Sequence, residues 1–279
     1  MEERKNRKKA EIIILVLLGI IGFAAVVSLI RELFEYSEGT VTYELLQEYV
    51  HLPEQEATPP SGTGDGAQAV VQGTGAAPEE ASGDSGKVYY GSCPQVNFDI
   101  LRIQNNDVVG WIYGPGTSIN YPVVQGEDND YYLTHMFDGE ENKCGSIFMD
   151  CLNEEDLSNR NTFIHGHHMR NGTMFASLPK YSSQSYYDTH PVLWFVTPGQ
   201  SYQVELFTGF VTDTESDAWR ISFATEEDYQ NWIDQMIASG AFKSDVRPGV
   251  DDRILSLATC SYEFDNARFV VMGILREVE

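Results

Sequence analysis

Positively charged residues are scarce in this sequence. The chain has 18 lysines and arginines against 42 aspartates and glutamates in 279 residues, which gives a formal net charge of -24. Proteins that bind nucleic acids need a basic surface to neutralise phosphates, so this composition argues against such a role. The acidic excess is otherwise compatible with plain solubility and identifies no partner.

Cysteine is also rare, with only four residues: Cys93, Cys144, Cys151 and Cys260. Small secreted modules held together by disulfides are far denser in cysteine, so that class of protein is excluded. A bridge between Cys144 and Cys151 is compatible with the composition, but their spacing alone does not establish it.

Large apolar side chains are almost missing from residues 53–88, which are dominated by Gly, Ala, Ser, Thr, Pro and acidic residues. Such a segment buries too little apolar surface to offset its ordering entropy, so the sequence predicts a flexible linker there. Residues 31–52 before it are typical of a short amphipathic helix, interpreted as a stalk. Residues 89–279 after it form the predicted globular domain.

One long apolar run, residues 12–30, contains 19 consecutive uncharged residues. As a helix it rises about 28 Å, close to the hydrocarbon thickness of a bilayer. Five basic residues lie within residues 1–11 and only Arg31 follows closely, which predicts a cytoplasmic tail, a membrane helix and an external remainder. A cleaved signal peptide is the alternative, but the run is longer than the usual apolar region of such peptides.

The predicted globular domain contains many short, β-branched segments separated by turn residues, a pattern typical of a closed or nearly closed barrel. Two helices are expected within it. One spans Asn97 to Asn106, and the other begins at Thr225 with an acidic first turn and ends at Gly240. Apolar residues in the second helix recur at helical spacing from Tyr229 to Ile237, which indicates packing against the barrel.

A cysteine and an arginine flank one short loop near the end of the chain. The runs from Ile254 to Thr259 and from Phe269 to Leu275 are expected to form an antiparallel pair of strands, joined by the polar segment 261–267. The last residue of one strand then faces the first residue of the next, so Cys260 and Arg268 should meet at one rim of a sheet. A thiol beside a fixed cation suits nucleophilic catalysis with a stabilised oxyanion.

A thiol nucleophile also needs a base, and histidine is the candidate for that role. Three of the six histidines, His165, His167 and His168, follow a short apolar run at the end of a predicted strand. A group that titrates near pH 6.5 beside a thiol can transfer the proton that a leaving amine requires.

Together these segments resemble a class B sortase, a cysteine transpeptidase of Gram-positive bacteria. The resemblance rests on Thr259-Cys260 with the downstream Arg268, on Gly166-His167, and on the segments 107–112 and 121–126, in the family's order. It implies a mainly β fold: a closed eight-stranded barrel with N-terminal helices, one helix inserted before the penultimate strand, and a transmembrane helix ahead of the domain.

The resemblance also implies residue roles. Cys260 is the nucleophile, His167 the general acid and base, and Arg268 the donor to the oxyanion, while Asn129, Leu133 and Thr259 match substrate-binding positions. The sequence departs from the family at His165, where an aromatic residue, usually tyrosine, is common. It departs again at His168, where asparagine is common, and at Ala258, where serine is common.

The implied activity is cleavage of a C-terminal sorting motif after its threonine through a thioester, followed by transfer to an amine of peptidoglycan or a pilin lysine. Expected partners are secreted proteins that carry the motif, at the outer face of the plasma membrane. No metal or organic cofactor is expected. Two alternatives remain: a zinc hydrolase that uses His165, His167 and His168, and a non-catalytic surface scaffold.

Overall fold

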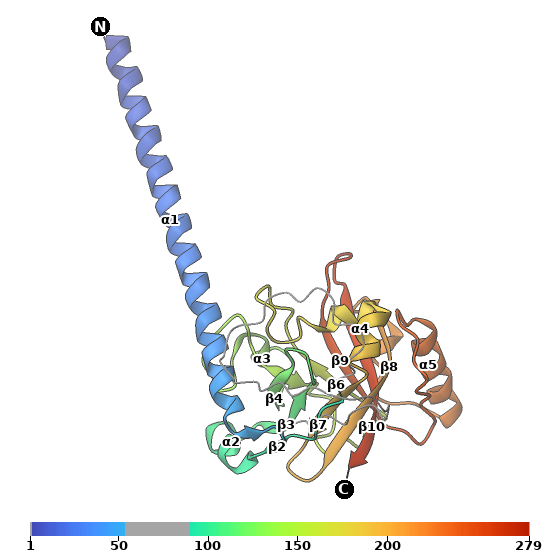
Figure 1. Cartoon of the computed structure of the whole chain (residues 1–279). Coiled ribbons are helices and arrows are strands. Elements are labelled where there is room, and N and C mark those ends of the chain that lie inside the picture. The colour runs from blue at the N-terminus through green and yellow to red at the C-terminus, as the bar shows by residue number, and fades with distance from the viewer. Residues whose placement is uncertain (1, 54–89, 279) are drawn as a thin grey trace, which may run out of the picture.

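The structure is a computed structural model that describes residues 2–53 and 90–278. The predicted linker, residues 53–88, therefore lies outside the described residues except for Pro53. Within the described ranges, eight strands close into a single barrel in the order β10, β8, β7, β3, β4, β5, β6, β9 (Figure 1). This architecture confirms the mainly β, closed eight-stranded fold that the sequence predicted.

Two of the strand pairs in the barrel, β4 with β5 and β6 with β9, are parallel, and the others are antiparallel. The barrel strands are β3 (Val108–Tyr113), β4 (Asn120–Val124), β5 (Ile147–Met149), β6 (Asn161–His165), β7 (Val192–Val196), β8 (Ser201–Thr212), β9 (Ile254–Cys260) and β10 (Arg268–Val278). The other elements are α1 (Glu2–Gln47), β1 (Val50–His51), β2 (Gln95–Val96), α2 (Phe98–Gln104), α3 (Tyr131–Thr134), η1 (Leu178–Ser182), α4 (Gln184–Thr189), η2 (Asp217–Trp219) and α5 (Glu226–Ala238).

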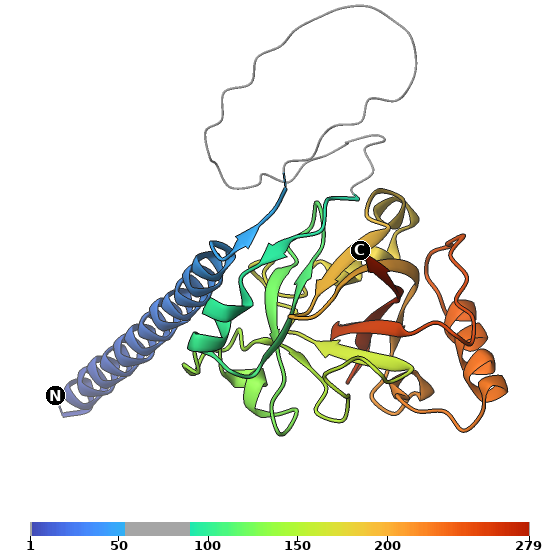
Figure 2. The same ribbon diagram turned by 90° about the horizontal axis from the view of Figure 1, so that it is seen from below.

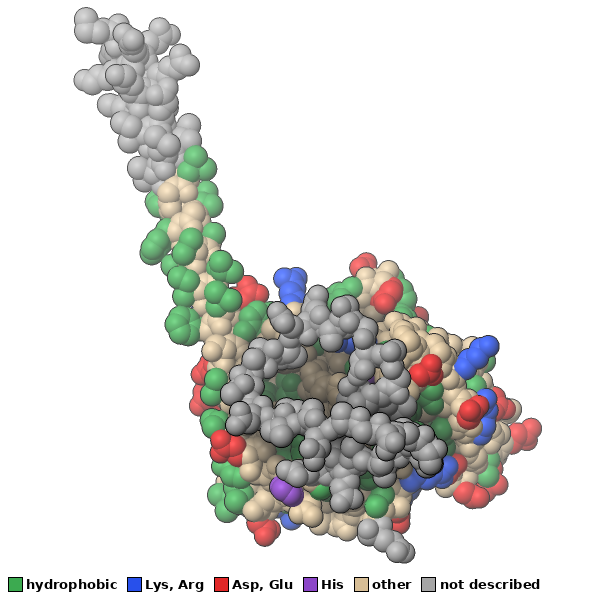
Figure 3. Space-filling view, in the orientation of Figure 1, with side chains coloured by type: hydrophobic (Ala, Val, Ile, Leu, Met, Phe, Trp, Pro, Cys, Tyr) green, Lys and Arg blue, Asp and Glu red, His purple; other side chains and the backbone are tan. Residues whose placement is uncertain are grey.

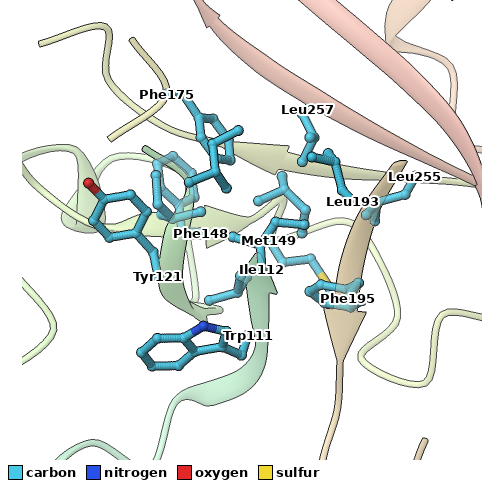
Figure 4. Packing of buried hydrophobic residues seen from close by; sticks show 14 of the residues in the cluster. Trp111, Ile112, Tyr121, Phe148, Met149, Phe175, Leu193, Phe195, Leu255 and Leu257 are labelled. Carbon is cyan, nitrogen blue, oxygen red and sulfur yellow. The ribbon is translucent and has the colours of Figure 1, made fainter. Parts of the chain in front are cut away.

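The strands β9 and β10 are buried on both faces. Phe269 and Val271 of β10 pack in the main core, whereas Val270 and Met272 belong to a second cluster together with residues of α5. A strand covered on both faces reads as a continuous apolar run instead of an alternating one. Figure 4 shows the packing of side chains from several strands in the main core.

Helix α5 lies directly before β9, the penultimate strand, as predicted. The Thr225 hydroxyl accepts a hydrogen bond from the Asp228 amide at 3.1 Å, which caps the first turn. The buried stripe consists of Tyr229, Trp232, Ile233 and Met236. These apolar side chains pack on the second cluster, so the helix serves the core rather than the site. Helix α2 is likewise confirmed, with the Asn97 side chain as its cap.

Helix α1 is continuous through the predicted membrane segment and into the predicted stalk. Its N-terminal part projects away from the barrel (Figures 1 and 2), and Figure 3 shows apolar side chains along the projecting surface. The segment Leu17–Gln47 is long and apolar enough to cross a membrane, with a window of mean hydropathy 2.0. The boundaries at residues 11, 30, 52 and 88 stay predictions.

The C-terminal end of α1 packs on the barrel. Tyr43 and Leu46 are each only 4% exposed and belong to the main core. After the helix, β1 pairs with β2 and places Val50 opposite Val96. The C-terminal end of the predicted stalk is therefore part of the folded domain, because two apolar side chains of the stalk are buried against the barrel.

Candidate active site

The hairpin of β9 and β10 brings Cys260 and Arg268 together. The two residues are direct register partners in the antiparallel pair, as the sequence predicted. The loop between them is closed by a hydrogen bond from the Ser261 amide to the Ala267 carbonyl, 2.9 Å long. The thiol and the guanidinium therefore sit side by side at the rim of the barrel, and both are partly exposed.

The Arg268 guanidinium has no acidic partner among residues 2–53 and 90–278. Its Nη1 donates to the carbonyl of Ala267 at 3.0 Å, and it forms no ion pair with any residue in the described ranges 2–53 and 90–278. The nearby Glu263 accepts a hydrogen bond from the Ser261 hydroxyl instead, and this bond lowers the pKa of Glu263. Arg268 does not pair with Glu263 or Asp265, the two acidic residues of the loop that precedes it.

The three clustered histidines have three different partners. Nε2 of His165 lies 3.1 Å from the Asp150 carboxylate, Nε2 of His167 lies 2.7 Å from the Leu133 carbonyl oxygen, and Nδ1 of His168 lies 3.1 Å from the Cys260 carbonyl oxygen. In the part of the chain that the structure describes, no group of three His, Cys, Asp or Glu side chains is placed to hold a metal ion. The separate partners of these rings argue against the zinc alternative.

One pocket of about 270 Å³ is lined by Cys260, Arg268 and His167. Its lining includes the nucleophile, base and cation candidates and the three predicted substrate-binding residues. The residues that line it are Asn129, Leu133, Phe148, His165, Gly166, His167, Thr214, Trp219, Ala258, Thr259, Cys260 and Arg268. All six predicted site residues, which are spread over 140 positions of the sequence, thus contribute to one cavity.

The three residues predicted to bind substrate differ in whether their side chains are already used in bonds within the protein. The Asn129 amide is occupied on both sides, since it donates to Asp150 at 3.0 Å and accepts from the Cys151 amide at 2.8 Å. The Thr259 hydroxyl donates to the Gly166 carbonyl at 2.8 Å. Leu133 has an exposed side chain at 36%. The first two shape the pocket through internal bonds, and their contact with a substrate stays a prediction.

Asp150 is a functional candidate that the sequence reasoning missed. Burial would raise the pKa of its carboxyl, but hydrogen bonds from His165, the Leu152 amide and Asn129 outweigh burial and hold that pKa below its ordinary value. Asp150 follows directly on β5, so a carboxylate at a strand end was the available signal. Its partner across the sheet was not readable without the register of β5 and β6.

Aromatic rings surround His165 and form one wall of the pocket. Its ring centroid lies 5.2 Å from that of Phe148, 6.0 Å from that of Phe163 and 6.3 Å from that of Trp219. Trp219 is fixed in η2 by a hydrogen bond from its indole to the Asp213 carbonyl at 2.8 Å. His165 therefore places a ring at a position where an aromatic residue is common in class B sortases, and it also bonds to Asp150.

The family of the chain follows from its sequence as a whole. A family model described as the sortase domain matches residues 112–276, which is more than half of the chain and contains every one of the predicted site residues. The chain therefore belongs to the sortase family of cysteine transpeptidases.

Individual relatives narrow this to class B. The chain is 39% identical to sortase B of Staphylococcus aureus over 183 residues, covering 65% of this chain and 75% of the relative. It is 35% identical to sortase B of Listeria monocytogenes over 177 residues, covering 63% and 72%. A solved S. aureus sortase B–substrate complex matches with a TM-score of 0.62 and 38% identity, and the match covers 65% of this chain and 85% of that chain. These matches confirm the class B resemblance.

Proposed function

We propose that the chain acts as a membrane-anchored class B sortase in which Cys260 is the nucleophile, His167 the general acid and base, and Arg268 the oxyanion donor. One observation supports this assignment above others. These three side chains line the same pocket, and Arg268 faces Cys260 with no acidic residue in the described ranges to neutralise it. A cation without a protein partner is available to a developing negative charge.

The first half of the reaction forms a thioester. The Cys260 sulfur, as thiolate, attacks a peptide carbonyl carbon, and the carbonyl oxygen gains negative charge that Arg268 binds. The carbon–nitrogen bond then breaks, and protonated His167 gives its proton to the leaving amine. The amino-terminal portion of the substrate remains bound to sulfur through its carbonyl carbon, and the carboxyl-terminal portion departs with a new amino terminus.

The second half transfers the acyl group. An acceptor amine attacks the thioester carbonyl and loses a proton to His167, the carbon–sulfur bond breaks, and the Cys260 thiolate is restored. No oxidant, reductant or bound cofactor is required in this sequence of steps. The guanidinium serves both halves, because an oxyanion develops on the same oxygen in each of them.

The donor substrate that we propose is a secreted protein with a C-terminal sorting motif, cleaved after threonine. A similar protein, S. aureus sortase B, has been solved in complex with its substrate, and this similarity supports a sorting-motif substrate for the chain. The proposed acceptor is an amine of the peptidoglycan stem or cross-bridge, or the lysine of a pilin.

We further propose that α1 anchors the protein in the plasma membrane with its amino terminus in the cytoplasm and the barrel outside. The apolar segment of α1 and the basic residues ahead of it support this orientation. Intact-mass analysis of protein purified from membranes tests it, because an anchored enzyme retains residues 1–30. A mature chain that lacks them would indicate a signal peptide instead.

Internally quenched peptides with threonine at the cleavage site test the activity. The full-length chain in detergent micelles should cleave a subset of them, and added hydroxylamine should increase turnover and yield the peptide hydroxamate after threonine. Hydrolysis without any hydroxamate would indicate a peptidase that does not transfer. A chelator should leave the rate unchanged, whereas inactivation that zinc restores would support the metal alternative.

A further inference from the structure

The contact between His167 and Leu133 fixes which ring nitrogen carries the proton. A backbone carbonyl oxygen only accepts hydrogen bonds, so Nε2 of His167 must be the donor to the Leu133 carbonyl at 2.7 Å. In the neutral ring, Nδ1 is then the basic nitrogen. The position of the Leu133 carbonyl therefore sets both the tautomer and the orientation of the proposed base.

The Leu133 carbonyl belongs to α3, a helix of a single turn, which is too short to be stable by itself. A loop of residues 142–146, here called the bracing loop, holds that turn from behind. The Ser146 amide donates to the Tyr132 carbonyl at 2.9 Å, and the Asn142 amide donates to the Thr134 carbonyl at 2.8 Å. The carbonyls on both sides of Leu133 are thus fixed by the same loop.

Gly145 brings the bracing loop into direct contact with this turn. Its φ is +53°, and a Cβ at this position would lie 2.5 Å from the carbonyl oxygen of Tyr132 and 2.6 Å from that of Leu133. Only glycine permits such an approach without displacing the carbonyls. A displacement of the loop would therefore be transmitted to the acceptor of the His167 hydrogen bond.

The bracing loop is held in turn by the lower end of α1. The hydroxyl of Tyr43 donates to the Gly145 carbonyl at 2.6 Å and lies 3.2 Å from the Ser146 hydroxyl oxygen. Glu35 adds two contacts: its carbonyl accepts from the Asn142 side chain at 3.0 Å, and its carboxylate pairs with Lys143 at 2.9 Å. Because Tyr43 is 4% exposed, its bonds are shielded from competing water.

We propose that α1 positions the catalytic base, with Tyr43 as the positioning residue, through the bracing loop and the Leu133 carbonyl to His167. This inference rests on the proposed function of His167. The helix that extends from the barrel toward the membrane is then part of the active-site scaffold as well as an anchor. Misplacement of a catalytic group by a fraction of an ångström lowers turnover even when substrate binding is intact.

The variant Tyr43→Phe tests the proposal in the full-length chain in detergent micelles. It keeps the ring and its edge contact with Tyr121 but removes the hydroxyl that holds the bracing loop. Loss of one such bond should lower kcat by about 3- to 10-fold and leave KM unchanged. In ¹⁵N-histidine spectra, the His167 Nε2 and Nδ1 signals should move toward those of a ring in tautomer exchange.

The matched control is Gln47→Ala on the same helix. This side chain bonds to the barrel at the Asn120 carbonyl, 3.1 Å away, and is not part of the bracing-loop contacts described above. It should lower the Tm while kcat and the His167 signals stay at wild-type values. Equal effects of both variants on kcat would overturn the proposal, because they would reflect general loosening of the helix.

A second variant, Gly145→Ala, changes the bracing loop itself and leaves the Tyr43 side chain in place. It should change the same His167 signals, and unaltered signals in the folded variant would contradict the proposal even if Tyr43→Phe did not fold. The variant His167→Ala separates the two claims. Full activity there would refute the proposed function, whereas an inactive His167→Ala beside a fully active Tyr43→Phe would refute the positioning role alone.

Discussion

Strand β10 carries one arginine at its start and another near its end, and their surroundings differ. Arg276 pairs with Glu205 at 3.0 Å and with Asp252 at 2.5 Å, and the neighbouring Arg253 pairs with Glu277 at 2.7 Å. Arg268, at the other end of the same strand, bonds only to the Ala267 carbonyl among the described groups. The chain has 42 acidic residues, so the lack of one beside Arg268 is specific to this end of the barrel.

The difference separates a cation that acidic residues neutralise from one that bonds only to a backbone carbonyl among the described groups. Burial alone would lower the pKa of Arg276, but its two carboxylate partners raise it above the ordinary value, which is the behaviour of a neutralised structural ion pair. At the pocket end, an acidic partner would compete with a substrate carbonyl for the guanidinium. The arrangement predicts that changes at the two ends affect different measurements: turnover at the Arg268 end and stability at the Arg276 end.

The largest effect is expected for Cys260→Ala at the pocket end. It should abolish both peptide cleavage and transfer to hydroxylamine, because Cys260 is the one cysteine among the described residues that line the pocket. The control is Cys93→Ala, which removes a free thiol that does not line the pocket and should keep full activity. Cleavage by Cys260→Ala at the wild-type rate would contradict the mechanism.

The next effect concerns His167→Ala, which should lower kcat by about 10² to 10⁴, the usual contribution of a general acid and base. His165→Ala and His168→Ala should keep a measurable share of activity, since their rings bond to Asp150 and to the Cys260 carbonyl. The measurement is kcat of each variant, compared after circular dichroism has shown that the variants are folded like the wild type. Equal losses in all three variants would show that the cluster acts as a unit.

A smaller loss, about 10² in kcat/KM, is expected for Arg268→Lys, because lysine keeps the charge but not the planar, directional donors. Its Tm should stay close to the wild-type value. The matched variant Arg276→Lys, on the same strand, should show the opposite: wild-type kcat/KM with a Tm lowered slightly, as the loss of an exposed ion pair is worth about 0.5 kcal/mol. Full activity in Arg268→Lys would remove the contrast between the two ends.

The last prediction concerns stability instead of turnover: Asp150→Asn should show a pH-dependent loss of stability. The folded-state pKa of Asp150 lies below its unfolded value, so its contribution is present above the unfolded pKa and disappears as pH falls through the folded pKa. The variant should lose about 1 kcal/mol of unfolding free energy near pH 7. The difference from wild type should shrink as pH falls through the folded-state pKa, as urea denaturation at several pH values would measure.

The sequence predicted the parts of this site that depend on local pattern. The Cys260 and Arg268 pairing followed from two strands and a short loop, and α5 followed from its cap and apolar spacing. Three features depend instead on contacts between distant segments: the bond of His165 to Asp150, the parallel pairs of the barrel, and the docking of Tyr43 beside Gly145. No periodicity in one segment specifies which distant segment it will meet.

The helical segment after the apolar run, residues 31–47, shows this limit most clearly. Its amphipathic pattern was interpreted as a stalk, because apolar residues on a helix next to a linker do not reveal the surface that buries them. The structure places that surface on the barrel, at the bracing loop. The family motifs predicted the identities of the site residues, whereas the support behind His167 became visible only in three dimensions.

Intact-mass spectrometry of the full-length enzyme, mixed with a cleaved peptide and no amine, tests the central claim most directly. The account predicts an adduct equal to the peptide fragment ending in threonine, mapped to Cys260 and released by hydroxylamine. The same experiment with Arg268→Lys should give the same adduct at a slower rate. Peptide cleavage with no adduct on Cys260, or with an adduct on another residue, would contradict the assignment of the pocket as a thioester-forming site.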